Sequence, residues 1–319
     1  MLNHRRLLPT LCVASFAAFL VANCGPIRST LDRPPTPAEL AELWAPPGDE
    51  TRQQALYGPG GAEAAPNPDV IYKQVEVKKG GFSPKVEVVD PSGRKWTVKM
   101  GPEAQSEVTS SRILWMLGYR QPPEYCLTGW KLGREDGVHT LGPGRFRPHL
   151  DWVDGKGQWK WSENPFVGSQ PYRGLLVLMM VLNNTDLKDN NNEVYRVKRA
   201  GGHSEHWYSV RDLGASLGET GWSGQRRNNI EFFEKQAFIT GVNENHPVFE
   251  FHGRRKGLLD QVTVADVRWI CEGLRALTPE QRRDAFKASG YDEETTRRYL
   301  AKIDEKVGQG LSLAAEGKQ

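Results

Sequence analysis

Five polar residues interrupt apolar segments of the chain, at positions where a charge or an amide needs a chemical reason. Lys99 and Asp212 lie at the ends of two predicted strands, and Glu107 lies within the apolar stripe of a predicted helix. Asp186 and Asn191 follow a strongly apolar run. An acid or base in such a place is costly unless it has a partner. Phosphoryl transfer from ATP uses this set of groups. A lysine holds the phosphates, an acid orients it, one aspartate accepts a proton, and an asparagine and a second aspartate hold metal ions.

The segments that carry these residues resemble motifs of the protein kinase-like superfamily. "DLKDNN" at 186–191 is similar to the catalytic loop D-L-K-x-x-N, and "DLG" at 212–214 to the metal-binding D-F-G. "WTVKM" at 96–100 resembles the strand of the nucleotide lysine, and "GGFSPK" at 80–85 a shortened glycine-rich loop. The resemblance covers residues 72–300 and is closer to HipA-type and lipid-kinase-like groups than to ordinary eukaryotic kinases. The chain also resembles uncharacterised exported bacterial proteins with "VKxGxEAQSE" and "DLGAxLG" patterns.

The resemblance implies a nucleotide site. Lys99 would contact the phosphates of ATP, and Glu107 would orient Lys99. Because Glu107 follows Lys99 by only eight residues, Glu103 stays a second candidate for this pairing. The expected glycine-rich loop would cover the phosphates with the backbone N–H groups of Gly80, Gly81 and Ser83.

It also implies a transfer site and a Mg²⁺ site. Asp186 would be the general base, and Lys188 would neutralise charge on the transferred phosphoryl group. Asn191 and Asp212 would bind Mg²⁺. The sequence departs from the family where "NNT" replaces His-Arg before Asp186, where Leu213 replaces Phe, and where no A-P-E motif follows "DLG". A conventional activation loop is therefore not expected.

Each of these residues also has a purely structural interpretation. The loop at 183–192 could be an Asn-rich turn, Asp212 could cap a turn, and a strand lysine such as Lys99 is usually solvated. A calcium loop does not fit, because Lys188 stands where an acid is needed and no glycine follows. Arg226 and Arg227 form either a solvated basic turn or a receptor for an anionic substrate. The order of the motifs along the chain favours the site.

The elements that would position these residues predict an α+β class with two lobes, and the resemblance implies that these lobes form a kinase-like fold. Three consecutive strands are expected at 72–79, 86–90 and 95–100, then a helix at 102–119 and a strand at 125–132. An insertion at 133–170 precedes a buried helix at 172–182 and two strands, and the pattern is helical from residue 230. We expect a small β-rich lobe with one helix at 71–132 and a larger, mainly helical lobe at 133–310. Residues 25–70 read as a linker or strap, and 311–319 as a flexible tail.

Residues 1–24 read as an export signal. Arg5 and Arg6 are followed by an apolar run at 7–22 that is too short for a comfortable membrane span. The segment ends in "LVANCG", which resembles a lipoprotein processing site with Cys24 as the lipidated residue, although Asn23 is unusual there. Plain secretion and an uncleaved anchor stay open. We expect the periplasm or cell envelope, with membrane attachment only through a lipid on Cys24.

Composition limits the partners of the chain. Its 319 residues carry a net charge of +3, which argues against nucleic-acid binding by charge alone. No CxxC or HExxH occurs, so a zinc site has no support. Cys126 and Cys271 are either two buried thiols or a disulfide.

Two functions are consistent with these observations. One is an exported phosphotransferase that uses ATP and Mg²⁺ and acts on an unknown protein, lipid or sugar. The other is a catalytically silent, kinase-like binding module (a pseudokinase) on the cell envelope. Scarcity of ATP outside the cytoplasm favours the second, whereas the intact set of Lys99, Asp186, Asn191 and Asp212 favours the first. A solute-binding lipoprotein would need two alternating α/β lobes, which the helical C-terminal half does not suggest.

Overall fold

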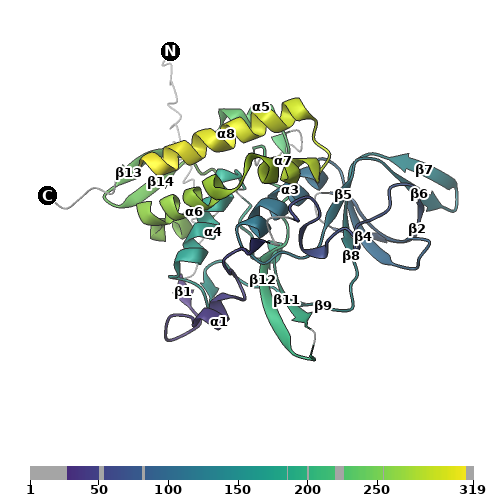
Figure 1. The fold of residues 1–319 in the computed structure, drawn as a ribbon, viewed down its shortest axis with the longest axis horizontal. Helices are drawn as coiled ribbons and strands as arrows, with labels where there is room; N and C mark the ends of the chain where they lie inside the picture. The colour runs from purple at the N-terminus through teal and green to yellow at the C-terminus, as the bar shows by residue number, and fades with distance from the viewer. Residues whose placement is uncertain are drawn as a thin grey trace, which may run out of the picture.

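The fold combines one large β-sheet with a group of helices (Figure 1). The computed structural model describes residues 27–49, 54–80, 83–184, 186–199, 201–219, 226–253 and 255–313. The sheet and the helices form a β-rich lobe with one helix and a larger, mainly helical lobe. The predicted α+β class with these two lobes is therefore confirmed. The expected export signal, the C-terminal tail from residue 314 and Gly81 lie outside the described residues.

The β-rich lobe is a seven-stranded sheet with the order β5-β8-β4-β3-β2-β6-β7. Its strands are β2 (Ile71–Lys78), β3 (Lys85–Val89), β4 (Lys95–Met100), β5 (Tyr125–Leu127), β6 (Trp130–Arg134), β7 (Gly137–Leu141) and β8 (Gly144–Pro148). Neighbouring strands are antiparallel except β2 and β6. The alternating pattern of β4 buries Trp96 and Val98 in the lobe's own core. Thr97 and Lys99 therefore face the opposite side of the sheet.

Helix α3 (Glu103–Met116) follows β4 directly and belongs to both lobes. Twelve of its 14 residues are buried, including most of its polar ones. Its hydroxyls find partners in the helical lobe: Ser106 Oγ donates to the carbonyl of Gly214 at 2.9 Å, and Thr109 Oγ1 to Ser289 Oγ at 2.7 Å. These bonds explain how a helix with so few large apolar residues is stable in an interior position.

The helical lobe surrounds the buried helix α4 (Gln170–Val181). The other helices are α5 (Ile230–Lys235), α6 (Val264–Ala276), α7 (Pro279–Lys287) and α8 (Glu293–Ser312). Their N-termini are capped as their sequences predict, for example by Thr263 and Thr278, whose side chains form capping boxes with the third residue of each helix. Among the described helices, none is both long enough and apolar enough to span a bilayer.

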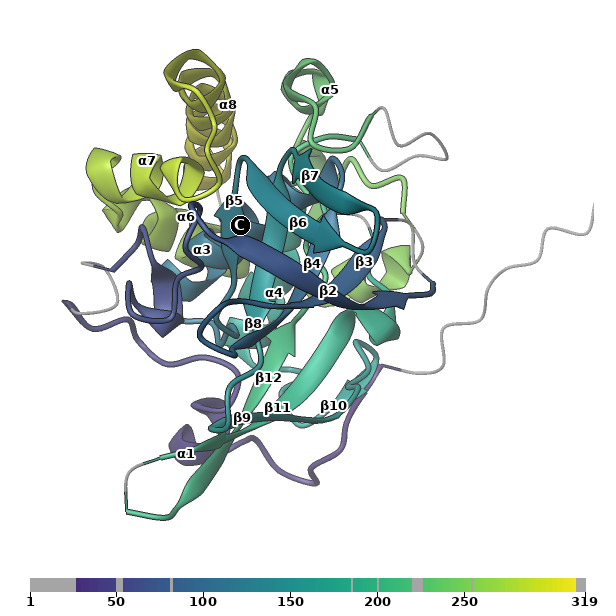
Figure 2. The same ribbon diagram turned by 90° about the vertical axis from the view of Figure 1, so that its right-hand side faces the viewer.

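A three-stranded sheet, with the order β12-β11-β9, lies beside the junction of the lobes (Figure 2). Its strands are β9 (Val153–Gly157), β11 (Asn192–Lys198) and β12 (Ser204–Val210). Asn192 pairs with Val210, so the start of β11 and the end of β12 lie side by side. This register brings the polar loop before β11 next to the Asp-Leu-Gly segment after β12.

The N-terminal segment crosses the helical lobe as short elements. Strand β1 (Arg28–Ser29) pairs with β10 (Glu163–Asn164), and α1 (Pro37–Leu40) and the 3-10 turn η1 (Gly58–Gly60) follow. Trp44 Nε1 donates to the carbonyl of Leu117 at 2.7 Å, which attaches this segment to the end of α3.

Several elements differ from those expected from sequence. The strand expected at 125–132 is two strands, β5 and β6, which are not neighbours in the sheet. The segment expected as an insertion contains β7 to β10, so the large sheet continues to Pro148.

The expected helical run after residue 230 is interrupted by a hairpin, β13 (Ile239–Asn243) and β14 (His246–Phe249), whose turn has Glu244 at φ 55°. The 3-10 turn η4 (Lys256–Gln261) leads from the hairpin to α6. Cys126 and Cys271 are free thiols, so the disulfide alternative is wrong; Cys271 is buried as the other alternative holds, whereas Cys126 is half-buried.

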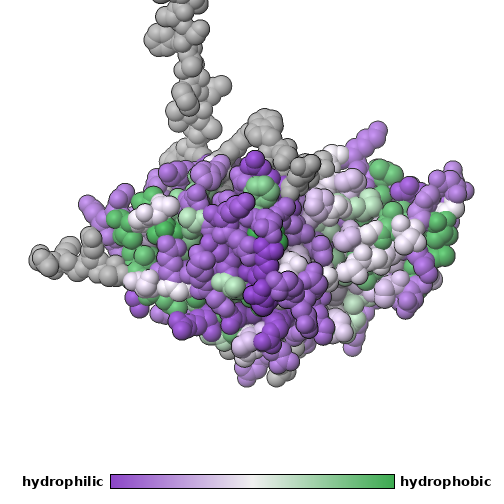
Figure 3. Space-filling view, turned by 90° about the horizontal axis from the view of Figure 1, so that it is seen from above, coloured by the Kyte–Doolittle hydropathy of each residue, from purple (hydrophilic) through white to green (hydrophobic). Residues whose placement is uncertain are grey.

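Apolar side chains are exposed at the outer end of the β-rich lobe (Figure 3). Ile71, Val75 and Val77 of β2 and Val138 of β7 are each about half exposed.

Candidate active site

The ammonium group of Lys99 lies between three carboxylates at the junction of the lobes. Its Nζ is 2.7 Å from Glu107 Oε2, 2.8 Å from Glu103 Oε2 and 2.8 Å from Asp212 Oδ1. Lys99 is 1% exposed, so these contacts are sheltered from water. Glu103 and Glu107 are four residues apart and therefore share one face of α3. Both candidates for the partner of Lys99 make the contact.

Each glutamate also binds a second set of groups. Glu107 Oε1 lies 3.0 Å from Arg145 Nε and 3.3 Å from an Arg147 nitrogen. Glu103 accepts a hydrogen bond from Ser83 Oγ at 2.7 Å and forms an ion pair with Arg227. These additional cations compensate the excess of negative charge around Lys99. Glu103 thus links the loop before β3 to a segment of the helical lobe.

The glycine of the Asp-Leu-Gly segment is required by this packing. A Cβ atom at Gly214 would lie 2.6 Å from Glu103 Cβ and 3.0 Å from Lys99 Nζ. The buried side chain of Leu213 packs into the core of the helical lobe. Leu213 therefore anchors the segment, while Gly214 allows it to approach α3 closely enough for Asp212 to reach Lys99.

The polar loop after α4 is tied to Asp212 by backbone hydrogen bonds. The carbonyl of Asn191 accepts from the backbone N–H groups of Arg211 at 2.7 Å and Asp212 at 3.1 Å. Asn191 Nδ2 in turn donates to the carbonyl of Asp186 at 2.8 Å. The Asp186 carboxylate forms an ion pair with Lys188 at 2.8 Å. The structure therefore brings Asp186, Asn191 and Asp212 together across 26 residues of sequence.

The side-chain oxygens of Asp212 and Asn191 fit Mg²⁺ better than a metal ion whose ligands all come from the protein. Among the described residues, no group of three or more His, Cys, Asp and Glu side chains could hold a metal ion. Mg²⁺ is usually bound by one or two carboxylates together with phosphates and water. The Asp212 side chain is 36% exposed, and the neighbouring Asn191 supplies an amide oxygen, so these two residues match that pattern.

The charges of this cluster shift the pKa values of its carboxyls. Burial opposes ionisation of Asp212, but the charge and hydrogen bond of Lys99 outweigh it and lower its pKa below the usual value. For Glu107, burial is outweighed by Arg145 and Lys99, and the pKa is lowered. For Glu124, burial outweighs the attraction of Arg147 and raises the pKa. Two of the carboxylates that contact Lys99, those of Glu107 and Asp212, are therefore held in the charged form.

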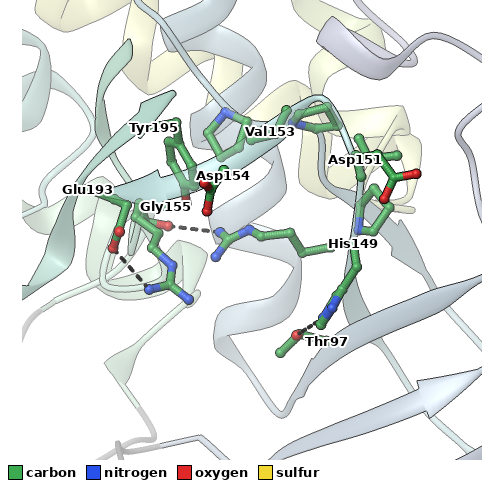
Figure 4. Close-up of a pocket in the computed structure, with 14 residues that line it drawn as sticks. Thr97, His149, Asp151, Val153, Asp154, Gly155, Glu193 and Tyr195 are labelled. Carbon is green, nitrogen blue, oxygen red and sulfur yellow. Dashed lines mark hydrogen bonds and ion pairs between the residues drawn. The ribbon is translucent and has the colours of Figure 1, made fainter. Parts of the chain in front are cut away.

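A cavity of about 460 Å³ lies between the lobes next to this cluster (Figure 4). Thr97, two residues before Lys99, and Arg211, one residue before Asp212, are among its walls. Thr97 Oγ1 is 2.9 Å from His149 Nε2, and Arg211 lies 3.4 Å from Glu193. Figure 4 shows Thr97 and His149 on the opposite side of the opening from Glu193. The cavity is polar and has the sheet lobe on one side and β11 on the other.

Sequence reasoning missed the residues that complete the cluster. Arg145 and Arg147 alternate with the buried Phe146 on β8, and Arg147 also contacts Glu124 at 2.6 Å. The alternation of "RFR" is typical of a strand with two arginines on one face. Nothing in one sequence indicates that this face meets Glu107, because the contact depends on β8 pairing with β4. Gly80 has φ 99° and open space around it, and its expected contact with phosphate stays a prediction.

No protein-family model and no curated protein matches the chain. Several solved kinase structures resemble it. CtkA, a proinflammatory kinase of Helicobacter pylori, shares 9% identity over 74% of this chain and 95% of its own, with a TM-score of 0.41. The Golgi casein kinase with Mn/ADP bound shares 10% identity over 78% of this chain and 72% of its own, with a TM-score of 0.38. The Rio2 kinase of Chaetomium thermophilum, in an ADP/Mg²⁺-phosphoaspartate complex, shares 11% identity over 76% and 73%, with a TM-score of 0.31.

At these identities and TM-scores the similarity carries no inference about chemistry. Kinship with HipA-type, lipid-kinase-like or exported bacterial proteins stays a prediction. The assignment of a function to this chain therefore depends on its own residues.

Proposed function

We propose that this chain is an ATP- and Mg²⁺-dependent phosphotransferase whose acceptor is a protein, lipid or sugar. One observation carries the proposal: Lys99 joins Glu107 of α3 to Asp212 of the helical lobe, with contacts of 2.7 and 2.8 Å. A lysine that pairs a helix glutamate while lying next to a metal-binding aspartate is part of the machinery of phosphoryl transfer. The burial of Lys99 and Glu107 supports this interpretation, because a purely solvated lysine would need none of these partners.

The loop residues would then act on the acceptor and the transferred group. Asp186 would accept the proton of the acceptor hydroxyl, and Lys188, whose side chain is about half exposed, would face the phosphoryl group. Asn191 and Asp212 would hold Mg²⁺, which when bound neutralises charge on the phosphates. The backbone of the loop that contains Gly80 and Ser83 would cover the phosphates. The base of the nucleotide would enter the cavity of Figure 4, whose wall includes Arg211, the residue before Asp212.

We further propose that the chain is exported and works in the periplasm or on the cell envelope, attached through a lipid on Cys24. The alternative function is a silent binding module, and one observation favours it: three carboxylates already surround Lys99, which leaves little room for an anionic phosphate. Binding and turnover measurements separate the two functions.

The first test is titration calorimetry of ATP with and without Mg²⁺. We expect the wild type to bind MgATP, and Asp212→Asn to lose the dependence on Mg²⁺, because the substitution removes the only negatively charged ligand proposed for the metal ion. Asp69→Asn, in an exposed loop of the β-rich lobe, is the matched control. A wild type that binds no nucleotide under any condition would remove the phosphotransferase proposal.

The second test measures ADP formation and phosphate transfer to candidate acceptors. Asp186→Asn should bind MgATP normally but lower turnover by roughly 100-fold or more, as expected for loss of a general base. If the wild type binds MgATP but equals Asp186→Asn in turnover, the chain is a binding module instead.

A further inference from the structure

Lys99 is poorly placed to contact a phosphate in this structure. Its ammonium has three N–H donors, and it hydrogen-bonds Glu107 and Asp212 and forms an ion pair with Glu103. If Asp212 turned away toward a metal ion, the two glutamates would still hold the ammonium. Their negative charge would also repel an approaching phosphate.

A second lysine lies on the same side of the sheet. Lys85 is the first residue of β3 and pairs directly with Lys99 of β4 in an antiparallel register. Residues directly opposite in such a pair project from the same face, with Cβ atoms about 5 Å apart. Lys85 and Glu87 therefore face the junction of the lobes, whereas the intervening Val86 is buried in the lobe's core.

Lys85 is the cation of this face that has room for a ligand. Its side chain is half-buried. Among the described residues, none forms an ion pair or a side-chain hydrogen bond with its ammonium. Burial lowers its pKa, the charge of Asp212 acts in the opposite direction, and the charge of Lys99 lowers it further. The ammonium therefore lies within the electrostatic influence of Asp212 but forms no ion pair with it, and an anion beside it would be stabilised.

The position of Lys85 in the chain also suits a phosphate ligand. It ends the segment that begins with Gly80 at φ 99°, the segment expected to cover the phosphates. The side chain of Ser83, two residues earlier, is turned inward to Glu103 at 2.7 Å. This bond fixes the end of the loop against α3, and so fixes where β3 begins.

We infer that Lys85 is the lysine that binds the phosphates of the nucleotide, and that Lys99 is a structural cation that holds Asp212 against α3. This inference rests on the proposed function, since it names the residue that performs one of its steps. It changes the expectation from sequence, in which Lys99 contacts the phosphates.

Three lysine-to-methionine variants test this assignment by MgATP calorimetry and thermal unfolding. Lys85→Met should weaken MgATP binding by roughly 10- to 100-fold, the range for a hydrogen bond to a charged group, without lowering Tm. Lys99→Met should lower Tm, because it leaves Glu103 and Glu107 buried without that cation. Lys95→Met removes an exposed lysine from the same face of β4 and should change neither quantity.

Two further measurements make the result specific. Lys85→Arg should recover most of the affinity of the wild type for MgATP, and Lys85→Met should bind adenosine as well as the wild type does, because adenosine has no phosphates. Unchanged MgATP affinity in Lys85→Met would overturn the inference while leaving the proposed function intact. A wild type that binds no MgATP would instead contradict the proposed function.

Discussion

Lys306 of α8 is a buried cation that forms an ion pair with no carboxylate in the described part of the chain. Its Nζ donates to the carbonyl of Val181, the last residue of α4, at 3.0 Å and lies 4.5 Å from the centre of the Phe233 ring. Burial is the main cause that lowers its pKa to about 7, with a contribution from Lys302, while Glu305 and Glu250 act in the opposite direction. The helix end that it contacts leads directly to the loop of Asp186.

This pKa predicts how stability changes with pH. The unfolded chain keeps this amine protonated up to an ordinary pKa near 10.5, whereas the folded chain releases the proton above about 7. Stability should therefore rise between pH 7 and 10.5, by at most about 1.4 kcal/mol per pH unit from this group. Urea unfolding at pH 6, 7.5 and 9 should show a steeper rise for the wild type than for Lys306→Met. Equal slopes in the two proteins would contradict this pKa assignment.

At the scale of elements, strand β8 stabilises helix α3 through its two arginines. Arg147 connects Glu107 of α3, Glu124 before β5 and the carbonyl of Arg211. It is therefore a contact between the sheet, the helix and the Asp-Leu-Gly segment.

Removal of Arg147 should be strongly destabilising. Arg147→Met leaves the buried Glu124 without its only ion pair among the described residues, and breaking a buried pair in this way costs about 3–5 kcal/mol. Guanidinium chloride unfolding measures this loss. Arg134→Met on β6, whose partner Gln74 is neutral and whose contact is exposed, should change the free energy of unfolding by less than about 1 kcal/mol. Similar losses of unfolding free energy in both variants would mean that the buried contacts of Arg147 stabilise the fold no more than an exposed hydrogen bond does.

The sequence allowed elements with a strong local pattern to be predicted. Strands β2, β3 and β4, helix α3 and helix α4 have clear alternation, caps or apolar runs, and each lies where it was expected. Predictions failed where neighbours along the chain are not neighbours in space. β5 and β6 are adjacent in sequence but separated by four strands in the sheet, and the "RFR" strand lies inside a segment that looked irregular.

The residues of the candidate site also divide into those that the sequence indicates and those that it does not. Lys99, Glu107 and Asp212 each stood out because a charge interrupted an apolar pattern, and the structure brings them together. Arg145, Arg147 and Glu124 gave no such signal, since a polar residue in an apparent loop needs no explanation. The availability of Lys85 depends on the strand register and on the partners of Lys99, and neither can be derived from one sequence.

At the scale of the whole molecule, α3 makes the two lobes a single folding unit. It packs against β8 and β5 on one side and bonds to Ser289 and Gly214 of the helical lobe on the other. Neither lobe can lose this helix without exposing a buried face.

We therefore expect one cooperative unfolding transition for the described body of the chain. Differential scanning calorimetry should give a calorimetric enthalpy equal to the van't Hoff enthalpy. Thr109→Val removes the hydroxyl that donates to Ser289 Oγ while keeping the shape of the side chain, and should lower that single Tm without splitting the transition. Two separate transitions in the wild type would show that the lobes unfold independently.

The burial of Lys99 also determines which lysine a chemical reagent can reach. Acylation needs an accessible neutral amine, and Lys99 is sheltered from solvent with its ammonium held by three carboxylates. Lys85 is partly accessible, and its lowered pKa increases the fraction of neutral amine. A nucleotide probe with an acyl-phosphate group should therefore label the peptide that contains Lys85 and spare that of Lys99. Mass spectrometry of the digested protein would then map the phosphate end of the site in the unmutated chain.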